Sequence, residues 1–168
     1  MSVKEKGFTL LELMIAVIIL GFVLGLGVPS FNSFIESSRL RAATHSLNTA
    51  VQLARSEALS RRENAAVCRS NSAQDACDFD VDWSSGWMVV AQQGSDLEDA
   101  ADVTVIKIWE SVDLVASGAA NGFAFDRLGR GITIGGVRIQ NDTDHRCISV
   151  NITGRTAVQE ISAGDSCP

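Results

Sequence analysis

The feature that most limits how this chain can fold is a run of 21 residues, from Phe8 to Val28, in which Glu12 is the single charged residue. As an α-helix, this run would be about 30 Å long, which matches the hydrocarbon thickness of a bilayer. A cleaved secretory signal peptide is the alternative, but no A-x-A-like cleavage site follows the run at the right distance. The sequence therefore predicts a retained membrane-spanning helix over residues 8–28.

The residues on either side of this run predict its orientation and a bend. Lys4 and Lys6 precede it, and basic residues tend to stay on the cytoplasmic side of a membrane. We therefore expect a single-pass protein with a cytoplasmic N-terminus and with everything after Pro29 outside the cytoplasm. Because proline removes a hydrogen bond from a helix, Pro29 also predicts a kink.

Glu12 needs an explanation, since a carboxylate in a membrane helix costs a few kcal/mol and such residues are often functional. One interpretation is a capping box, because Thr9-Leu-Leu-Glu12 fits the pattern S/T-x-x-E at a helix start. A second is a shallow position near the headgroups. A third requires cleavage after Gly7, which would create a new amine on Phe8 for Glu12 to pair with, in the same or a neighbouring chain.

The segment Lys6–Ile15, together with Pro29, resembles the class III signal of type IV pilins and type II secretion pseudopilins. In that family a prepilin peptidase cuts after the glycine and methylates the new amine. The resemblance implies that residues 1–7 form a cleaved leader, that Phe8 becomes N-methylphenylalanine and that Glu12 makes an assembly contact. It also implies a location in the bacterial inner membrane, a periplasmic head and entry into a filament as one of its subunits.

The rest of the chain changes from a helical to a strand pattern. In residues 29–64 apolar side chains recur at three- and four-residue spacing, which predicts an amphipathic periplasmic half of the same helix. Short β-prone runs follow at residues 65–68, 87–91, 103–109, 123–125, 132–134, 137–139 and 147–152. Gly135-Gly136 predicts a hairpin between two of them. We therefore expect an α+β, pilin-like fold, in which a long N-terminal helix packs against an antiparallel β-sheet head domain of residues 65–168.

Four cysteines, Cys68, Cys77, Cys147 and Cys167, all follow the apolar run. An even number in an oxidising compartment favours two disulfides, for which three pairings are possible. We favour Cys68–Cys77 and Cys147–Cys167, because each closes a local loop worth about 3 kcal/mol. A metal site is the competing interpretation, but the cysteines form no C-x-x-C pair and neither histidine stands beside them.

Charge is spread unevenly. Residues 69–110 hold nine acids against two basic residues, a net charge of −7, whereas residues from 123 onward hold five arginines and five acids. Such an acidic lobe could orient subunits in a complex or simply keep the surface soluble. The segment Asp78-Phe-Asp80-Val-Asp82 starts like a calcium-binding EF-hand loop, but Trp83 and Val89 stand where that loop needs glycine and glutamate. We expect no cofactor and no metal.

Two further segments, Phe125–Gly131 and Cys147–Arg155, resemble the GspH/FimT family. This family comprises the minor pseudopilin H of type II secretion and type IV pilus minor pilins of the FimT/FimU kind. The resemblance implies a structural subunit that helps to initiate or cap assembly of a periplasmic type IV pilus or type II secretion pseudopilus. Its partners would be the prepilin peptidase and other minor and major pilins or pseudopilins. We favour the type IV pilus slightly over the secretion system.

The alternative function is a DNA-binding minor pilin involved in natural transformation. Some relatives use a C-terminal Gly-Arg-x-Arg, but here Gly154-Arg155-Thr156-Ala157 lacks the second arginine and the whole chain carries a net charge of −6. Arg138, Arg146 and Arg155 are the candidate DNA contacts, although the acidic balance disfavours nucleic acid. We expect no enzyme activity, because His45 and His145 lack a neighbouring nucleophile or carboxylate constellation.

Overall fold

The computed structural model describes residues 7–94, 96–119 and 121–167, and of residues 26–30 it describes only the helical backbone. Residues 1–6, which make up most of the predicted leader, therefore lie outside the described residues. The chain divides into two compact units, Met1–Ser37 and Ser38–Pro168. The long helix α1, Leu10–Arg61, contributes to both units.

In the first unit, α1 presents apolar side chains that are exposed on all sides. Ile15 is 48% exposed and Leu10 is 77% exposed, and the other large apolar residues up to Leu24 lie between these values. Among the described residues, no helix is both long enough and apolar enough to qualify as a membrane span. The membrane-spanning role of residues 8–28 stays a prediction, as does the kink at Pro29, whose side chain lies outside the described residues.

In the second unit, α1 buries one face. Its buried apolar residues follow the three- and four-residue spacing of an amphipathic helix: Leu40, Ala43, Leu47, Ala50, Val51, Ala54 and Ala58. The helix ends at Arg61, and Arg62 then takes a left-handed conformation with φ of 58°. Such a residue commonly terminates a helix, and here it turns the chain into the first strand.

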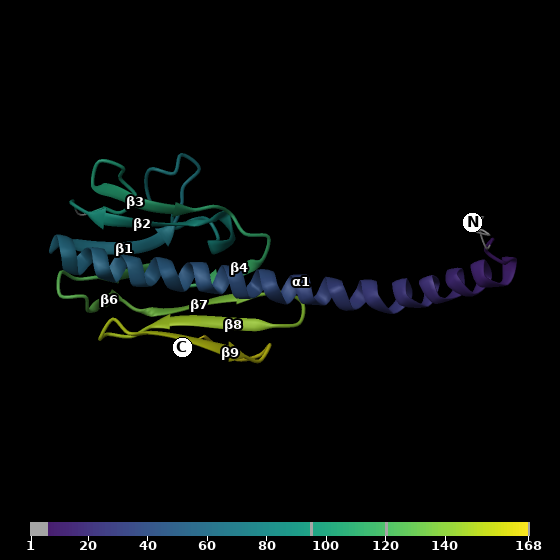
Figure 1. The fold of residues 1–168 in the computed structure, drawn as a ribbon. Helices are drawn as coiled ribbons and strands as arrows, with labels where there is room; N and C mark the ends of the chain where they lie inside the picture. The colour runs from purple at the N-terminus through teal and green to yellow at the C-terminus, as the bar shows by residue number, and fades with distance from the viewer. Residues whose placement is uncertain (1–6, 95, 120, 168) are drawn as a thin grey trace, which may run out of the picture. The chain divides into compact units, whose positions relative to one another are not determined.

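Two antiparallel sheets lie beside this half of α1 (Figure 1). The five-stranded sheet has the order β3-β2-β1-β5-β6 and the four-stranded sheet the order β4-β7-β8-β9. The strands are β1 (Asn64–Arg69), β2 (Trp87–Gln92), β3 (Val103–Trp109), β4 (Val115–Gly118), β5 (Phe123–Phe125), β6 (Gly131–Thr133), β7 (Gly135–Gln140), β8 (His145–Val150) and β9 (Thr156–Ile161). A short 3₁₀ helix, η1 (Trp83–Ser85), precedes β2.

The main core lies between α1 and the inner faces of both sheets. Its largest side chains come from the helix, from η1 and from strands of each sheet: Leu40, Leu47, Trp83, Trp87, Phe123, Phe125, Ile139 and Ile148. The Trp83 indole N–H donates to the Gly118 carbonyl at 2.9 Å, so its polar atom is satisfied inside this core. A second, smaller cluster around Cys68, Met88 and Val90 covers the outer face of the five-stranded sheet.

The expected fold class is confirmed, because a long N-terminal helix packs on antiparallel strands. The expectation of one sheet and of a hairpin at Gly135-Gly136 was wrong. Strand β6 pairs with β5, whereas β7 pairs with β4 and β8. Gly135 adopts a φ of 143°, which glycine tolerates most readily, and lets the chain pass from one sheet into the other instead of folding back.

Candidate functional site

A capping box closes the start of α1. The Thr9 hydroxyl oxygen accepts a hydrogen bond from the Glu12 N–H at 3.2 Å. In return, Glu12 Oε2 accepts bonds from the Thr9 N–H at 3.0 Å and from the Thr9 hydroxyl at 3.1 Å. These bonds satisfy amides that have no partner within the first turn of a helix. The capping interpretation of Glu12 is therefore seen in the structure, and its role as an assembly contact stays a prediction.

The predicted cleavage site lies just before this cap. Gly7 is exposed, and a β-carbon placed on it would have no described atom within 4 Å. Phe8 is 76% exposed. The Gly7–Phe8 bond thus stands clear of the described part of the chain, as a protease substrate must, while cleavage and N-methylation themselves remain predictions.

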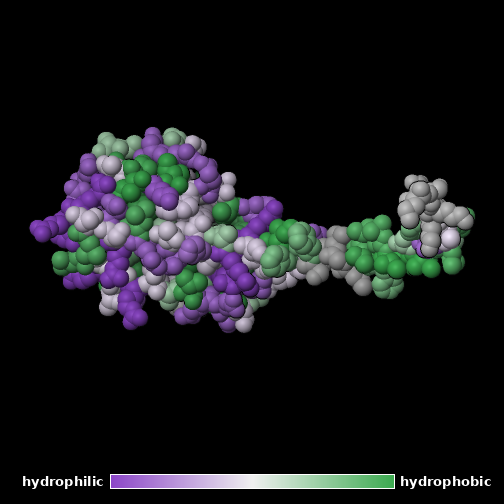
Figure 2. All heavy atoms as spheres, in the orientation of Figure 1, coloured by the Kyte–Doolittle hydropathy of each residue, from purple (hydrophilic) through white to green (hydrophobic). Residues whose placement is uncertain are grey.

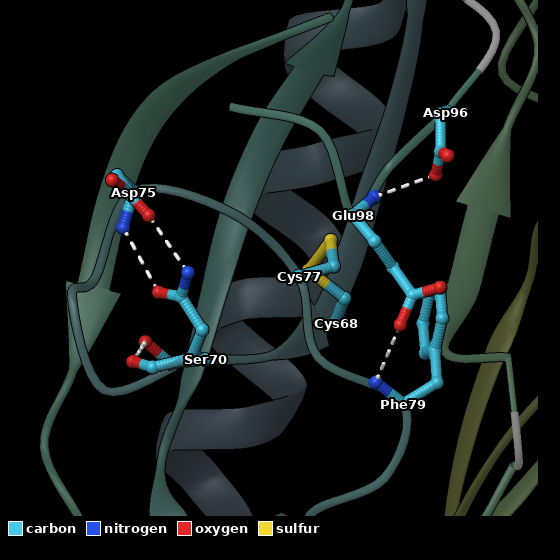
Figure 3. The surroundings of a disulfide bond; sticks show 8 residues. Cys68, Ser70, Asp75, Cys77, Phe79, Asp96 and Glu98 are labelled. Atoms are coloured by element: carbon cyan, nitrogen blue, oxygen red, sulfur yellow. Dashed lines mark hydrogen bonds between the residues drawn. A yellow bond between two sulfur atoms is a disulfide. The ribbon is translucent and has the colours of Figure 1, made fainter. Parts of the chain in front are cut away.

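The acid-rich region after β1 is pinned by the disulfide between Cys68 and Cys77, whose Cα atoms are 5.6 Å apart. Both cysteines are almost fully buried. Figure 3 shows the loop that follows β1 meeting a second acidic loop at this bond. There, Glu98 Oε1 accepts a hydrogen bond from the Phe79 N–H at 3.3 Å, and Asp96 Oδ1 accepts one from the Glu98 N–H at 2.9 Å.

Several polar side chains of this region hold local turns. Asp75 and Asn71 exchange two hydrogen bonds, of 2.7 and 3.1 Å. Asp78 Oδ1 accepts from the Asp80 N–H at 2.9 Å. Within the described ranges, no three His, Cys, Asp or Glu side chains stand together as metal ligands. The disulfide and these turns together present a structured acidic surface.

Two loops of the head have the same architecture: Asp126–Arg130 and Asn151–Arg155, which we call the paired loops. In each, an Asp or Asn begins the loop and a Gly-Arg dipeptide ends it. Asp126 Oδ1 accepts from the N–H groups of Leu128 at 2.9 Å and Arg130 at 2.8 Å. In the second loop Asn151 Oδ1 accepts from the corresponding N–H groups, of Thr153 and Arg155, both at 3.0 Å.

The backbones of the paired loops also correspond. Gly129 and Gly154 adopt φ of 71° and 72°, a left-handed conformation that glycine takes without strain. The Gly129 N–H donates to the Asp126 carbonyl and the Gly154 N–H donates to the Asn151 carbonyl, each at 2.8 Å. Each loop is therefore a tight turn defined by its first side chain and its glycine.

Asp126 also pairs with the Arg130 side chain at 2.7 Å. The pKa of Asp126 lies below its usual range, mainly because the carboxylate accepts the Arg130 backbone N–H. Partial burial opposes this shift, and the Arg130 side chain and the Leu128 N–H reinforce it. The first loop is therefore held by the charged carboxylate of Asp126, and the second by the neutral amide of Asn151.

Arg55 of α1 joins the paired loops. Its Nε donates to the Gly129 carbonyl at 3.0 Å, and a terminal nitrogen donates to the Thr153 carbonyl at 3.4 Å. The loops also meet directly, because a β-carbon on Gly154 would lie 2.1 Å from the Gly129 carbonyl oxygen. A surface groove of about 430 Å³ runs beside this junction, lined by Gln52, Arg55, Ser56, Leu59, Gly154, Arg155 and Thr156.

The three arginines predicted as DNA contacts do not form one patch. Arg138 of β7 stands opposite Cys147, and Arg146 stands opposite Ile139. Since side chains alternate along a strand, Arg138 and Arg146 lie on opposite faces of the four-stranded sheet. Arg146 forms an ion pair with Glu160 of β9, and Arg155 lies in the second of the paired loops beyond the end of β8.

The remaining candidate residues take structural positions. Cys147 and Cys167 form the second disulfide, with Cα atoms 5.5 Å apart, and this tethers the C-terminal segment to β8. Both pairings are those favoured from the sequence. His45 is exposed on α1. His145 Nδ1 lies 3.1 Å from Gln140 Oε1 on the neighbouring strand.

Sequence reasoning missed the junction that Arg55 makes. Arg55 falls within the amphipathic segment 29–64 and Asn151 within the β-prone run 147–152, so neither residue stands out from its neighbours. The signal was the repeated pattern of Asp or Asn, two residues, Gly and Arg, which occurs at residues 126–130 and 151–155. Because Asp or Asn followed by glycine marks a turn, this repetition predicts two equivalent turns, although not that one arginine joins them.

Comparison with known proteins gives two family-model matches. The model described as type II transport protein GspH matches residues 43–154, two thirds of the chain. The prokaryotic N-terminal methylation motif matches residues 3–28. No curated protein sequence matches the chain.

Solved structures with a similar fold include two crystal forms of the type IV minor pilin FimU from Pseudomonas aeruginosa. The first has a TM-score of 0.56 and 22% identity and covers 80% of this chain and 99% of that chain. The second has a TM-score of 0.53 and 23% identity, with coverages of 76% and 99%. At these identities the similarity concerns the fold.

Proposed function

This chain belongs to the family of the type II transport protein GspH, and we propose that it is a minor pilin or pseudopilin that helps to initiate or cap a periplasmic filament. One observation carries the proposal: a single chain joins an N-terminal methylation motif to a GspH-type head. The motif supplies the means of entering a filament, and the head supplies surfaces for contacts with other subunits. Neither role requires a cofactor.

The N-terminal motif supports processing and anchoring. We propose that prepilin peptidase removes residues 1–7 and methylates Phe8, and that the apolar start of α1 holds the protein in the bacterial inner membrane before assembly. The exposed Gly7–Phe8 bond is consistent with cleavage. The head would then face the periplasm, where its two disulfides are chemically favoured.

The architecture of the head supports a structural role. The polar contacts of Asp126, Asn151 and Arg55 in the paired loops are directed at backbone groups of the same chain. Such contacts hold the shape of a surface. The members of such families are structural pilins, and we propose that this head likewise has a structural role.

The experiment that tests the proposal is a clean deletion of the gene in its source bacterium. Surface pili and twitching motility are scored in parallel with enzyme activity exported to the medium. Loss of pili with normal secretion identifies a type IV minor pilin, and loss of secretion with normal pili identifies a secretion pseudopilin. Normal pili and normal secretion would contradict the proposal. Complementation by the full-length chain controls for effects on neighbouring genes.

A further inference from the structure

An apolar surface surrounds the paired loops. Five large side chains, each between 49% and 68% exposed, form what we call the loop patch: Leu59, Leu128, Ile132, Ile134 and Ile152. Figure 2 shows a small group of hydrophobic atoms among hydrophilic ones at the end of the head where α1 terminates. Single exposed apolar residues are ordinary on a protein surface, but contiguous ones mark sites where another molecule binds.

The segments that carry the loop patch contact one another. A β-carbon on Gly129, next to Leu128, would lie 3.1 Å from Leu59 Cγ, so the helix packs on the first loop. The Gly131 N–H donates to the Ile152 carbonyl at 3.2 Å, which joins β6 to the second loop. A β-carbon on Gly131 would lie 3.1 Å from Ile134 Cγ2. The four parts of the chain that carry these side chains, namely the end of α1, the two paired loops and β6 with Ile134, are therefore joined to one another.

The patch is held rigidly, which favours binding because little order has to be created when a partner arrives. The two Asx side chains fix the turns that carry Leu128 and Ile152, and Arg55 holds both turns against α1. Phe125, which directly precedes the first loop, is fully buried in the main core. These apolar side chains thus remain exposed beside a completed core.

Two exposed arginines border the loop patch, although the chain as a whole is acidic. Arg127 and Arg155 are exposed beside Leu128 and Ile152, whereas the charge of Arg130 is balanced by Asp126. Arginine is enriched at the centres of protein interfaces, where apolar contact and charge act together. A partner that complements this surface would present apolar side chains among carboxylates.

We propose that the loop patch docks onto an acidic head surface of a different filament subunit, an inference that rests on the proposed function. A second copy of this chain offers an acidic lobe as well, but the contact would join two different surfaces of identical molecules. Repetition of such a contact produces an open-ended array. A subunit that initiates or caps a filament requires a contact that is made once, so the occupant is another subunit.

The test is site-specific photo-crosslinking in the source bacterium, with a benzoyl-phenylalanine probe at Ile152 of the full-length chain and a matched probe at Val115 of β4, which is 58% exposed. The expected result is a product between the Ile152 probe and a different pilin-like subunit, mapped by mass spectrometry to an acidic segment of its head. The Val115 probe should give no such product. Products only between copies of this chain, equal products from both probes, or none from Ile152 would overturn the proposal.

Substitutions test the same surface without a probe. Ile152→Glu and Arg155→Glu should each reduce the number of assembled filaments, or the exported activity, by about tenfold, the effect of losing one strong interface residue. Val115→Glu should leave both unchanged. Immunoblots of mature, disulfide-bonded protein confirm that each variant folds. If the gene deletion abolishes filaments or secretion but Ile152→Glu and Arg155→Glu behave as wild type, the proposed function stands and this inference fails.

Discussion

Asp126 and Asn151 perform the same structural task with different chemistry, and this makes pH a probe of their turns. Each side chain accepts two backbone N–H groups of its own loop. The carboxylate loses its charge on protonation, whereas the amide does not titrate. The first loop should therefore respond to acid and the second should not.

Replacing Asp126 tests this response. The pKa of Asp126 is lowered in the folded head, so its stabilising contribution is fully present above the ordinary pKa of about 3.9 and is lost as pH falls through the lower folded value. We expect Asp126→Asn to retain the turn at neutral pH, as Asn151 does, and to flatten the loss of stability that the wild-type head shows as pH falls below about 4. Asp126→Ala should destabilise the head at every pH. Urea unfolding across this pH range measures both, and an unchanged acid dependence in Asp126→Asn would count against this account.

Among the residues of the paired loops, Gly154 is the one at which an added methyl group should destabilise the head most. Its φ is 72°, and a β-carbon there would lie 2.1 Å from the Gly129 carbonyl oxygen. We expect Gly154→Ala to lower the free energy of unfolding by about 1–3 kcal/mol through backbone strain and separation of the loops. Gly164→Ala is the matched control, because a β-carbon there meets nothing within 4 Å. Equal urea midpoints for the two variants would show that the loops are not in close contact.

The two disulfides act on different elements, although each closes a short loop. Cys68–Cys77 spans 9 residues and holds the acidic lobe against the outer face of the five-stranded sheet, whereas Cys147–Cys167 spans 20 residues and tethers the C-terminal segment. On chain entropy alone, we expect each double alanine variant to lose about 2–3 kcal/mol of unfolding free energy. The loss should be larger for Cys68 and Cys77, since both are buried in a second core. Denaturation of the oxidised variants measures this order, and a greater loss for Cys147 and Cys167 would reverse the interpretation.

Elements with a strong local pattern were predictable from sequence. The spacing of apolar residues indicated α1, and β3 and β5 were expected within their observed bounds. Strands β4 and β9 were not, because Val-Ala-Ser-Gly is short and β9 has no buried face. These two segments form strands because β4 pairs with β7 and β9 pairs with β8. Such pairings depend on contacts with other parts of the chain, which the residue pattern within each segment does not reveal.

The division of the strands into two sheets was likewise beyond local pattern. Gly135-Gly136 has the composition of a hairpin turn, but β6 and β7 on either side of Ile134 pair with different strands. The chain therefore passes from one sheet to the other near Gly135. The candidate site divides in the same way. The N-terminal motif lies within a few consecutive residues and could be predicted from them. The junction of Arg55 with the paired loops could not, because it joins residues separated by 74 and 98 positions.

For the molecule as a whole, the central question is whether Glu12 serves its own helix or a neighbouring subunit. In the described chain it closes the capping box with Thr9. After the proposed cleavage, the Phe8 amine of an adjacent subunit would offer it a cationic partner in a low-dielectric surrounding, where such a pair is strong. The two roles make different demands, because an amide side chain can accept the capping bonds but carries no charge.

Glu12→Gln and Thr9→Val separate these roles. We expect Glu12→Gln to be cleaved and inserted normally but to reduce assembled filaments by about tenfold or more, as the loss of a buried charge pair would. Thr9→Val removes the capping hydroxyl and retains the Glu12 charge, so assembly should be nearly normal. Gly7→Asp is the reference for failed processing and should migrate as the uncleaved precursor. Filament counts and a processing immunoblot measure all three. If Thr9→Val failed as severely as Glu12→Gln, helix capping alone would explain Glu12, and a charge contact between subunits would no longer be needed.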